Sequence, residues 1–369
     1  MAIKNLFFFI IQNKYFGILL LFFGIFFNYF AIYLLISVIL INQYTKKNKL
    51  IFLILFYIVL TISLFDFWKL KIKKEKTIYK IQSDVSYSIS PDYGYHPKKN
   101  RIFSESIFKE KKKIDQIFYS INRYGHRITG KNNKNSKTCI FFHGGSYTFG
   151  QMLNDENSLP YQFNKELNFK YKVYNLGFNG YGPHQFLRKL ETKYLEDYKK
   201  CEESYIIYTF IPDHIGRAAG KRSWGDKSPR YILKNQKIFF KGFFSNYPFK
   251  IKMKLRKNFR NSLFFRTFIY DPNSINKIDN KIFINILNEI EKKSKKIWKK
   301  TQFVYILWNI DKINDKEIKD FFKNKKIIKV NNLNLKNIPT TNKYDGHPSD
   351  QINKLISSTI VKKLNWLNN

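Results

Sequence analysis

Three short segments of the chain hold residue types that acyl transfer requires. The first is Gly144-Gly145-Ser146, which directly follows an apolar run. Adjacent glycines permit a tight turn that brings backbone N–H groups close to a ligand, and a serine at such a turn is suited to act as a nucleophile. Because Gly-Gly-Ser is also common in ordinary loops, a turn or helix-capping role for Ser146 is the alternative.

The second and third segments could supply the remaining groups. Residues 175–183 contain three glycines and can present a backbone N–H to an oxyanion, although a flexible connection would look the same. Near the C-terminus, Asp345 stands two residues before His347. A carboxylate there can hold the imidazole in one tautomer and leave its other nitrogen free as a general base. Together, the segments contain a nucleophile, oxyanion donors, a base and a residue that orients the base.

The sequence excludes a different arrangement of a serine hydrolase. His143-Gly144-Gly145 is similar to the oxyanion loop of α/β-hydrolase lipases, which requires a Gly-x-Ser-x-Gly nucleophile elbow later in the chain. No such elbow occurs in the sequence. The three segments above therefore stay the leading candidates.

The elements expected to position these residues alternate between strands and helices. Apolar runs predict strands at 138–142, 171–175, 205–211, 302–308 and 326–330. Helical periodicity predicts helices at 159–167, 183–198, 279–299 and 316–323, and a last helix capped by Ser349. We predict an α/β, three-layer, doubly wound domain of the flavodoxin-like type, with about five parallel strands. Ligands of such sheets bind beyond the carboxyl ends of the strands, where the three segments lie.

The order and spacing of the segments resemble the blocks of the SGNH/GDSL hydrolase family over about residues 137–364. Residues 144–150 are similar to its first block, usually Gly-Asp-Ser, residues 175–177 to its second and residues 345–348 to its last. The resemblance implies Ser146 as the nucleophile, His347 as the base and Asp345 as the partner of the base. It also implies that the backbone N–H groups of Ser146 and Gly177 contribute to an oxyanion hole.

Two positions depart from the family pattern. Gly145 replaces the usual Asp, which is not the nucleophile of the family. After the third predicted strand, Asp213 or His214 stands where the family has an oxyanion-binding Asn. An ionised carboxylate would repel an oxyanion, whereas a histidine N–H can donate to it, so His214 is the expected third donor.

Further residues adjoin the expected site. We predict substrate contacts for Gly145, Asn179 and Arg217; Arg217 could hold an anionic group, or it could be a surface charge. Packing is the expected role of His143 and His184. No grouping of His, Cys, Asp and Glu has the spacing of metal ligands, so neither a metal nor another cofactor is predicted.

Residues 1–76 are predicted to anchor the chain in a membrane. Residues 16–41 carry no charge, and a helix of about 39 Å would cross a hydrocarbon core of ~30 Å. Residues 50–68 form a second candidate span, and a third follows if the stretch from Leu6 folds back near Asn28. Lysines between the spans favour a cytoplasmic loop, which would place the later residues outside the cytoplasm.

The rest of the chain is expected to divide into two parts. Residues 77–136 are polar and mixed, and they are interpreted as a linker and lead-in. The domain itself is expected at 137–369, with an insertion at about 220–272. Within the insertion, residues 250–268 predict a basic amphipathic helix, which either lies on a membrane surface or covers the domain with a solvated lysine face.

Charge and cysteine content add little about function. The net charge of +39 comes from 66 Lys and Arg against 27 Asp and Glu. Because the lysines are spread along the whole chain and no nucleic-acid-binding motif accompanies them, we interpret the charge as compositional and predict no nucleic-acid partner. Cys139 and Cys201 are too few for a disulfide framework and are expected to pack in the core.

These observations predict a membrane-anchored serine esterase or O-acyl transferase that works through a Ser146 acyl-enzyme. The family analogy suggests an acetyl ester of a cell-envelope carbohydrate or lipid as the substrate. Water and a sugar hydroxyl are alternative acceptors, because a hydrolase and a transferase use the same residues. A catalytically degenerate domain that binds glycans or assembles with an envelope complex is the alternative from another class. The altered third block favours that alternative, and the retention of all three triad residues favours the enzyme.

Overall fold

The computed structural model describes residues 79–222, 225–246, 248–251 and 274–364. The chain divides into two compact units, and nearly all described residues belong to the unit formed by 78–246 and 275–369. The predicted spans at 16–41 and 50–68 lie outside the described residues, as does nearly all of the predicted helix at 250–268. Within the described ranges, no helix is both long and apolar enough to cross a bilayer.

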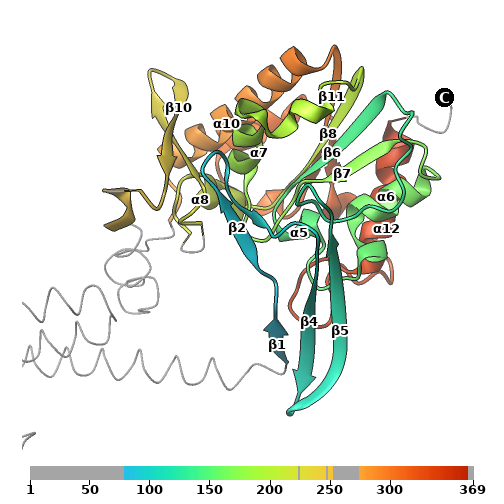
Figure 1. The fold of residues 1–369 in the computed structure, drawn as a ribbon. Helices are drawn as coiled ribbons and strands as arrows, with labels where there is room; N and C mark the ends of the chain where they lie inside the picture. Colours follow the sequence, from blue (N-terminus) through green and yellow to red (C-terminus); the bar gives the residue numbers. More distant parts are fainter. Residues whose placement is uncertain (1–78, 223–224, 247, 252–273, 365–369) are drawn as a thin grey trace, which may run out of the picture. The chain divides into compact units, whose positions relative to one another are not determined.

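A five-stranded parallel sheet forms the centre of this unit (Figure 1). Its order is β12-β11-β8-β6-β7, so the first of these strands along the chain lies between the second and the third. The predicted α/β architecture is confirmed, and each predicted strand overlaps an observed one. The observed bounds are β6 Thr138–Gly144, β7 Lys172–Asn175, β8 Glu203–Phe210, β11 Lys300–Leu307 and β12 Ile327–Lys329.

Helices cover both faces of the sheet. Alternate strand residues point to opposite sides, so each face buries its own set of side chains. Ile140 and Phe142 belong to one core cluster, whereas Cys139 and Phe141 belong to another. The first cluster includes α6 (Leu159–Glu166) and α12 (Asp350–Lys363). The second includes residues of α7 (Pro183–Glu191), α8 (Asp213–Ala218), α10 (Lys277–Ile297) and α11 (Lys316–Lys323).

Shorter elements connect these layers. They are α5 (Ser146–Phe149) and the 3₁₀ turns η1 (Asp155–Asn157), η2 (Lys193–Tyr198), η4 (Ile310–Lys312) and η5 (Val330–Asn332). The helix predicted at 183–198 is broken at Thr192, whose extended backbone separates α7 from η2. The last helix begins as predicted, since Ser349 Oγ accepts a hydrogen bond from Ile352 N–H at 3.1 Å. This cap fixes the point at which the preceding loop ends.

The segment at 77–136, interpreted as a linker and lead-in, holds folded β structure. Its strands are β1 (Lys80–Ser83), β2 (Tyr87–Ser90), β3 (Gly94–Pro97), β4 (Arg101–Lys109) and β5 (Lys112–Ile121). β4 and β5 form an antiparallel hairpin, and β1 pairs with β4. One face of this hairpin is buried: Phe103 and Ile107 pack in a third cluster with Phe149 and Phe178. The other face mixes polar residues with exposed hydrophobic ones such as Ile102 and Phe118, which gives the segment its mixed composition.

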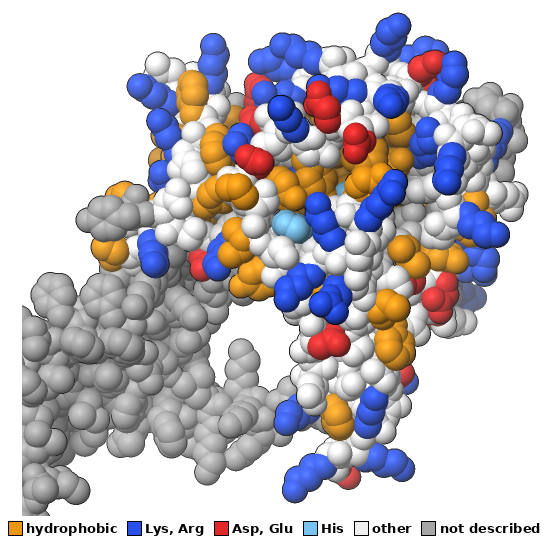
Figure 2. Space-filling view, in the orientation of Figure 1, with side chains coloured by type: hydrophobic (Ala, Val, Ile, Leu, Met, Phe, Trp, Pro, Cys, Tyr) orange, Lys and Arg blue, Asp and Glu red, His pale blue; other side chains and the backbone are white. Residues whose placement is uncertain are grey.

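The predicted insertion also contains strands. β9 (Pro229–Lys234) and β10 (Lys237–Phe243) form an antiparallel hairpin, and Tyr231 packs into the core beside α7 and α10. Figure 2 shows Lys and Arg side chains scattered over the visible face of the described residues rather than gathered in one patch. That distribution agrees with the dispersed charge of the sequence.

Cys139 and Cys201 are buried, as expected, and they also form a disulfide, with Cα atoms 5.8 Å apart. Cys139 lies near the start of β6, and Cys201 lies just before the neighbouring strand β8. Because parallel strands begin at the same edge of a sheet, residues 62 positions apart come together there.

The disulfide is expected to stabilise the domain. We expect Cys201→Ala to lower the free energy of unfolding by about 3 to 4 kcal/mol, because the cross-link restricts the unfolded chain. Urea unfolding with and without dithiothreitol measures the effect. The reductant should destabilise the wild-type protein and leave Cys201→Ala unchanged; a wild-type protein indifferent to the reductant would contradict the bond.

Candidate active site

Ser146 lies at the carboxyl edge of the parallel sheet, at the start of the one-turn helix α5. The chain turns through Gly144, whose φ is +149°, and a Cβ there would overlap Thr148 Oγ1. Only glycine fits this position. Phe149 N–H donates to Gly145 O at 3.0 Å and closes the turn. As the first helical residue, Ser146 has a backbone N–H without an intrahelical acceptor.

The loop that carries Asp345 and His347 is a tightly bonded turn. Asn342 N–H donates to His347 O at 2.7 Å, and Asn342 Nδ2 donates to Asp345 Oδ1 at 2.9 Å. His347 N–H also donates to Asp345 Oδ1, at 3.0 Å. These bonds hold the carboxylate and the imidazole in a fixed relation just before α12.

Ser146, His347 and Asp345 form one chain of hydrogen bonds. Ser146 Oγ lies 2.8 Å from His347 Nε2, and His347 Nδ1 lies 2.6 Å from Asp345 Oδ2. An ionised carboxylate can only accept, so Nδ1 carries the proton and Nε2 accepts from the serine hydroxyl. This arrangement corresponds to a nucleophile, a general base and the carboxylate that orients the base.

The surroundings of the triad favour an ionised Asp345 carboxylate. Partial burial acts to raise the pKa of Asp345, but the hydrogen bonds from His347 and Asn342 outweigh it and hold that pKa below its ordinary value. The side chains of His347 and Asp345 are 20% and 17% exposed, so solvent reaches this side of the site. Tyr147 lies edge-on to His347, with ring centroids 5.5 Å apart, and contacts Trp308 in the same way.

Arg217 fills the space beside Gly145. A Cβ on Gly145 would stand 2.5 Å from Arg217 Nη1 and 3.0 Å from His214 Nε2. The guanidinium is held there because Nη1 donates to Tyr181 O at 2.7 Å. Arg217 therefore takes up the room that a side chain at position 145 would need.

Asp213, the other candidate at the third block, is engaged by two arginines. Its carboxylate pairs with Arg217 Nε at 2.7 Å and with Arg222. Burial acts to raise the pKa of Asp213, but the charges of Arg217 and Arg222 outweigh it and hold the pKa below its ordinary value. The Asp213 carboxylate is thus paired with the two arginines, which leaves His214 as the candidate third oxyanion donor.

His214 is a buried, neutral imidazole. Its Nδ1 lies 2.7 Å from Tyr208 Oη, and its Nε2 is buried without a hydrogen-bond partner. Burial, reinforced by the charge of Arg217, holds the pKa of His214 well below its ordinary value. Burial also raises the pKa of Tyr208, which keeps its hydroxyl protonated. We assign this hydroxyl as the donor to Nδ1, so that Nε2 carries the His214 proton.

His143 and His184 pack in the core, as expected. The ring of His143 stacks between Phe186 and Tyr208, with centroids 4.2 and 4.6 Å away. Burial lowers the pKa of His143 and of His184 to about 3, so both imidazoles are neutral at physiological pH.

Gly177 and Asn179 are held by other contacts. Gly177 N–H donates to Asn175 Oδ1 at 3.1 Å, which occupies this predicted oxyanion donor in the structure. A Cβ on Gly177 would stand 2.7 Å from Thr148 Cβ, so the residue permits close packing on α5. Asn179 O accepts a hydrogen bond from Tyr95 Oη at 2.9 Å, and its Oδ1 is buried without a partner.

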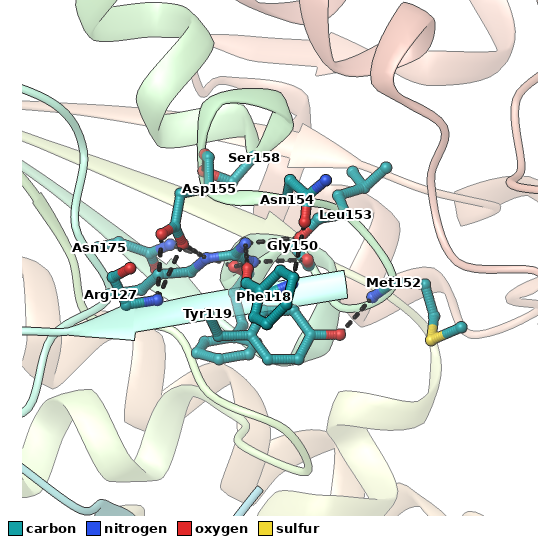
Figure 3. A network of polar contacts seen from close by, with 12 residues as sticks. Phe118, Tyr119, Arg127, Gly150, Met152, Leu153, Asn154, Asp155, Ser158 and Asn175 are labelled. Carbon is teal, nitrogen blue, oxygen red and sulfur yellow. Dashed lines mark hydrogen bonds and ion pairs between the residues drawn. The ribbon is translucent and has the colours of Figure 1, made fainter. Parts of the chain in front are cut away.

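Sequence reasoning missed several residues that support this site. Arg127 is a fully buried side chain bonded to the loop that follows Ser146 (Figure 3). It lies in the segment interpreted as a lead-in, where nothing distinguishes it from a surface arginine. Tyr208 bonds to His214, and Asn342 bonds to Asp345, so both support the site through other residues.

No arrangement of side chains in the described ranges is suited to a metal ion. Groups of three or more His, Cys, Asp or Glu that could ligate one do not occur there.

No model of a known protein family matches the sequence, and no curated protein matches it either. Solved structures that are similar at low identity include two esterases. One is a carbohydrate esterase whose active site displays divergent catalytic and non-catalytic binding functions: identity is 10%, the TM-score is 0.34, and the match covers 78% of this chain and 97% of that chain.

The other is the acetyl xylan esterase Est2A from the rumen bacterium Butyrivibrio proteoclasticus. Identity is 11%, the TM-score is 0.35, and the match covers 79% of this chain and 89% of that chain.

Buried neutral histidines should make the domain sensitive to acid. In an unfolded chain, histidine titrates near pH 6.5, whereas folding lowers the pKa of His143 and His184 to about 3. Between these values the unfolded state binds more protons, so stability falls as the pH falls, by up to about 1.4 kcal/mol per pH unit for each histidine. Urea unfolding at pH 7 and pH 5 measures this loss.

His143→Phe is the matched variant, because phenylalanine keeps the ring stack and cannot bind a proton. Its stability should fall less between pH 7 and pH 5 than that of the wild-type protein. Equal losses in the two proteins would show that His143 does not carry this pH dependence.

Proposed function

We propose that this protein is a serine esterase or acyltransferase that acts through an acyl-enzyme on Ser146. The observation that carries the proposal is the hydrogen-bonded chain from Ser146 Oγ through His347 to Asp345, with distances of 2.8 and 2.6 Å. These residues lie up to 201 positions apart in the sequence, so no local turn accounts for their meeting. Nucleophile, base and orienting carboxylate are the groups that acyl transfer to a serine requires.

In the proposed reaction, Ser146 Oγ attacks the ester carbonyl while His347 Nε2 takes the hydroxyl proton. The carbonyl oxygen becomes an oxyanion, and we propose the Ser146 N–H and His214 Nε2–H as its donors. Gly177 N–H would have to release Asn175 Oδ1 before it could donate as well. His347 then returns the proton to the leaving alcohol, and the carbonyl re-forms as an ester of Ser146.

The second half of the reaction reverses these steps with a new acceptor. His347 removes a proton from water or from a substrate hydroxyl, and the resulting nucleophile attacks the acyl-enzyme. Water gives hydrolysis and a free acid, whereas a hydroxyl gives a new ester. The same residues serve both outcomes, so the acceptor decides between esterase and transferase.

For the substrate, we propose an acyl ester, with acetyl first, of a carbohydrate or lipid of the cell envelope. We also propose that residues 16–41 and 50–68 anchor the chain and that the catalytic domain lies outside the cytoplasm. The Cys139–Cys201 disulfide supports this location, because disulfides persist mainly in oxidising compartments. Arg217 and Asn179 contribute to substrate binding in this proposal, beside Gly145.

The first experiment is hydrolysis of p-nitrophenyl acetate by the full-length chain and by Ser146→Ala. Without the nucleophile, kcat should fall by at least about 1,000-fold. A fluorophosphonate probe should phosphonylate Ser146 in the wild-type protein with loss of fluoride, so that the mass of Ser146 rises by that of the probe less hydrogen fluoride. Ser358→Ala is the control, since this serine on α12 bonds to Glu166 and stands apart from the triad.

Two outcomes would contradict the proposal. Hydrolysis that survives Ser146→Ala would point to another nucleophile. A folded wild-type protein that neither hydrolyses the ester, transfers its acyl group to a glycan acceptor nor reacts with the probe would favour the alternative, a degenerate glycan-binding module. The histidine at the third block motivates that alternative.

The oxyanion role of His214 has its own test. We expect His214→Phe to lower kcat by about 100- to 1,000-fold, because one donor to the oxyanion is lost. His214→Asn restores the amide that the SGNH/GDSL family has at this block, and it should keep kcat within about ten-fold of the wild type. His143→Phe controls for loss of a buried imidazole. Equal kcat values for His214→Phe and His143→Phe would remove His214 from the oxyanion hole.

A further inference from the structure

We propose that Arg127 is a positioning residue for Ser146: it fixes the one-turn helix that carries the nucleophile and so makes the β4–β5 lead-in part of the catalytic machinery. The inference rests on the proposed function. It goes beyond that function because it assigns a role in the reaction to a segment that shares no residue with the triad.

The Arg127 guanidinium is buried and fully bonded (Figure 3). Its side chain is 0% exposed, and Nε pairs with Asp155 Oδ1 at 2.8 Å. The other N–H groups donate to four backbone carbonyls: Phe149 O at 2.8 Å, Gly150 O at 2.6 Å, Leu153 O at 2.6 Å and Phe118 O at 3.4 Å. A buried charge is tolerated when it is paired and its donors are satisfied, and both conditions hold here.

Three of these carbonyls belong to the chain that leaves α5. Ser146 O accepts hydrogen bonds from Gly150 N–H at 2.8 Å and from Gln151 N–H at 3.1 Å, so Ser146 and the residues that Arg127 binds form one rigid turn. A shift of Gly150 would therefore shift Ser146. Because Ser146 Oγ must stay within hydrogen-bond reach of His347 Nε2, the guanidinium sets the alignment of the nucleophile with its base.

The Arg127 side chain also contacts strand β5 of the lead-in. Arg127 lies over the ring of Tyr119 on β5, 4.6 Å from the centroid, and over the ring of Phe149, 5.1 Å away. Met152 N–H donates to Tyr119 Oη at 2.9 Å, and Tyr119 Oη donates to the buried Glu105 on β4. The lead-in thus contacts residues 149–153, the nucleophile loop, through both Tyr119 on the hairpin's β5 strand and Arg127, which lies just after that strand.

Asn175 ties the same loop to the sheet. Its Nδ2 donates to Thr148 O at 3.1 Å and to Phe149 O at 3.4 Å, while its backbone forms an antiparallel bridge with Arg127. Phe149 O therefore receives donors from two side chains, one from the lead-in and one from the end of β7. α5 has only one turn and few bonds of its own, so these outside donors determine its orientation.

Lysine cannot reproduce this arrangement, because it has three donors on a point charge instead of a planar fork of five. For Arg127→Lys we expect kcat, measured with p-nitrophenyl acetate on the full-length chain, to fall by about 10- to 100-fold, with KM within about two-fold. Titration of reactive serines with a fluorophosphonate probe, run to completion, gives kcat per folded site. Arg188→Lys is the matched control, since Arg188 also joins a carboxylate, Glu191, to a backbone carbonyl, that of Asp92, and should keep the wild-type kcat.

The readout separates positioning from stability. A purely structural role would reduce the number of titrated sites and leave kcat per site within about two-fold of the wild type, which would overturn the inference. If Arg127→Lys gives no folded protein, the same criterion applies to Asp155→Asn. This change preserves the side-chain shape and removes the charge that pairs with Arg127, and it should lower kcat per site by about 3- to 10-fold.

The inference and the proposed function fail in different ways. Hydrolysis that is undiminished in Ser146→Ala overturns the proposed function. Hydrolysis that depends on Ser146 but has an unchanged kcat per site in Arg127→Lys, or in Asp155→Asn where the lysine variant does not fold, overturns only the role of Arg127.

Discussion

The hydrogen bond between Ser146 Oγ and His347 Nε2 sets the strictest demand on this structure. It joins residues 201 positions apart at a distance of 2.8 Å, so β6 and the loop before α12 must end at the same edge of the sheet. Parallel strands meet that demand, because all their carboxyl ends lie together. Local devices complete the alignment: Gly144 turns the chain after β6, Asn342 binds the loop around His347, and Ser349 fixes the start of α12.

Gly145 and His214, two positions singled out in the sequence, lie close together. A side chain on Gly145 would collide with Arg217 Nη1, and the same virtual Cβ lies 3.0 Å from His214 Nε2. The glycine, the arginine and the histidine therefore lie together at one place in the site. Asp213 pairs with the arginine, and Tyr208 bonds to the histidine. A neutral imidazole at this place avoids the repulsion that a carboxylate would exert on an oxyanion.

The sequence predicted the sheet better than the segment that precedes it. Strands such as β6 are buried on both faces and appear as continuous apolar runs, which are easy to recognise. β4 has one exposed face, and its buried face includes Glu105 between Phe103 and Ile107, so its pattern looks polar and mixed. At the site, Ser146, His347 and Asp345 lie in short motifs whose order and spacing can be recognised in the sequence. Arg127 lies in no such motif, because it binds carbonyls of a loop that only the fold brings to it.

The separation of the triad along the chain also orders events during synthesis. Arg127, Asp155 and Ser146 lie within 29 consecutive residues, whereas His347 is among the last residues of the domain. All the groups that Arg127 binds are therefore synthesised before the base. In the proposed mechanism, Ser146 has no base to activate it until the segment before α12 has been synthesised, so the nascent chain is inert toward esters.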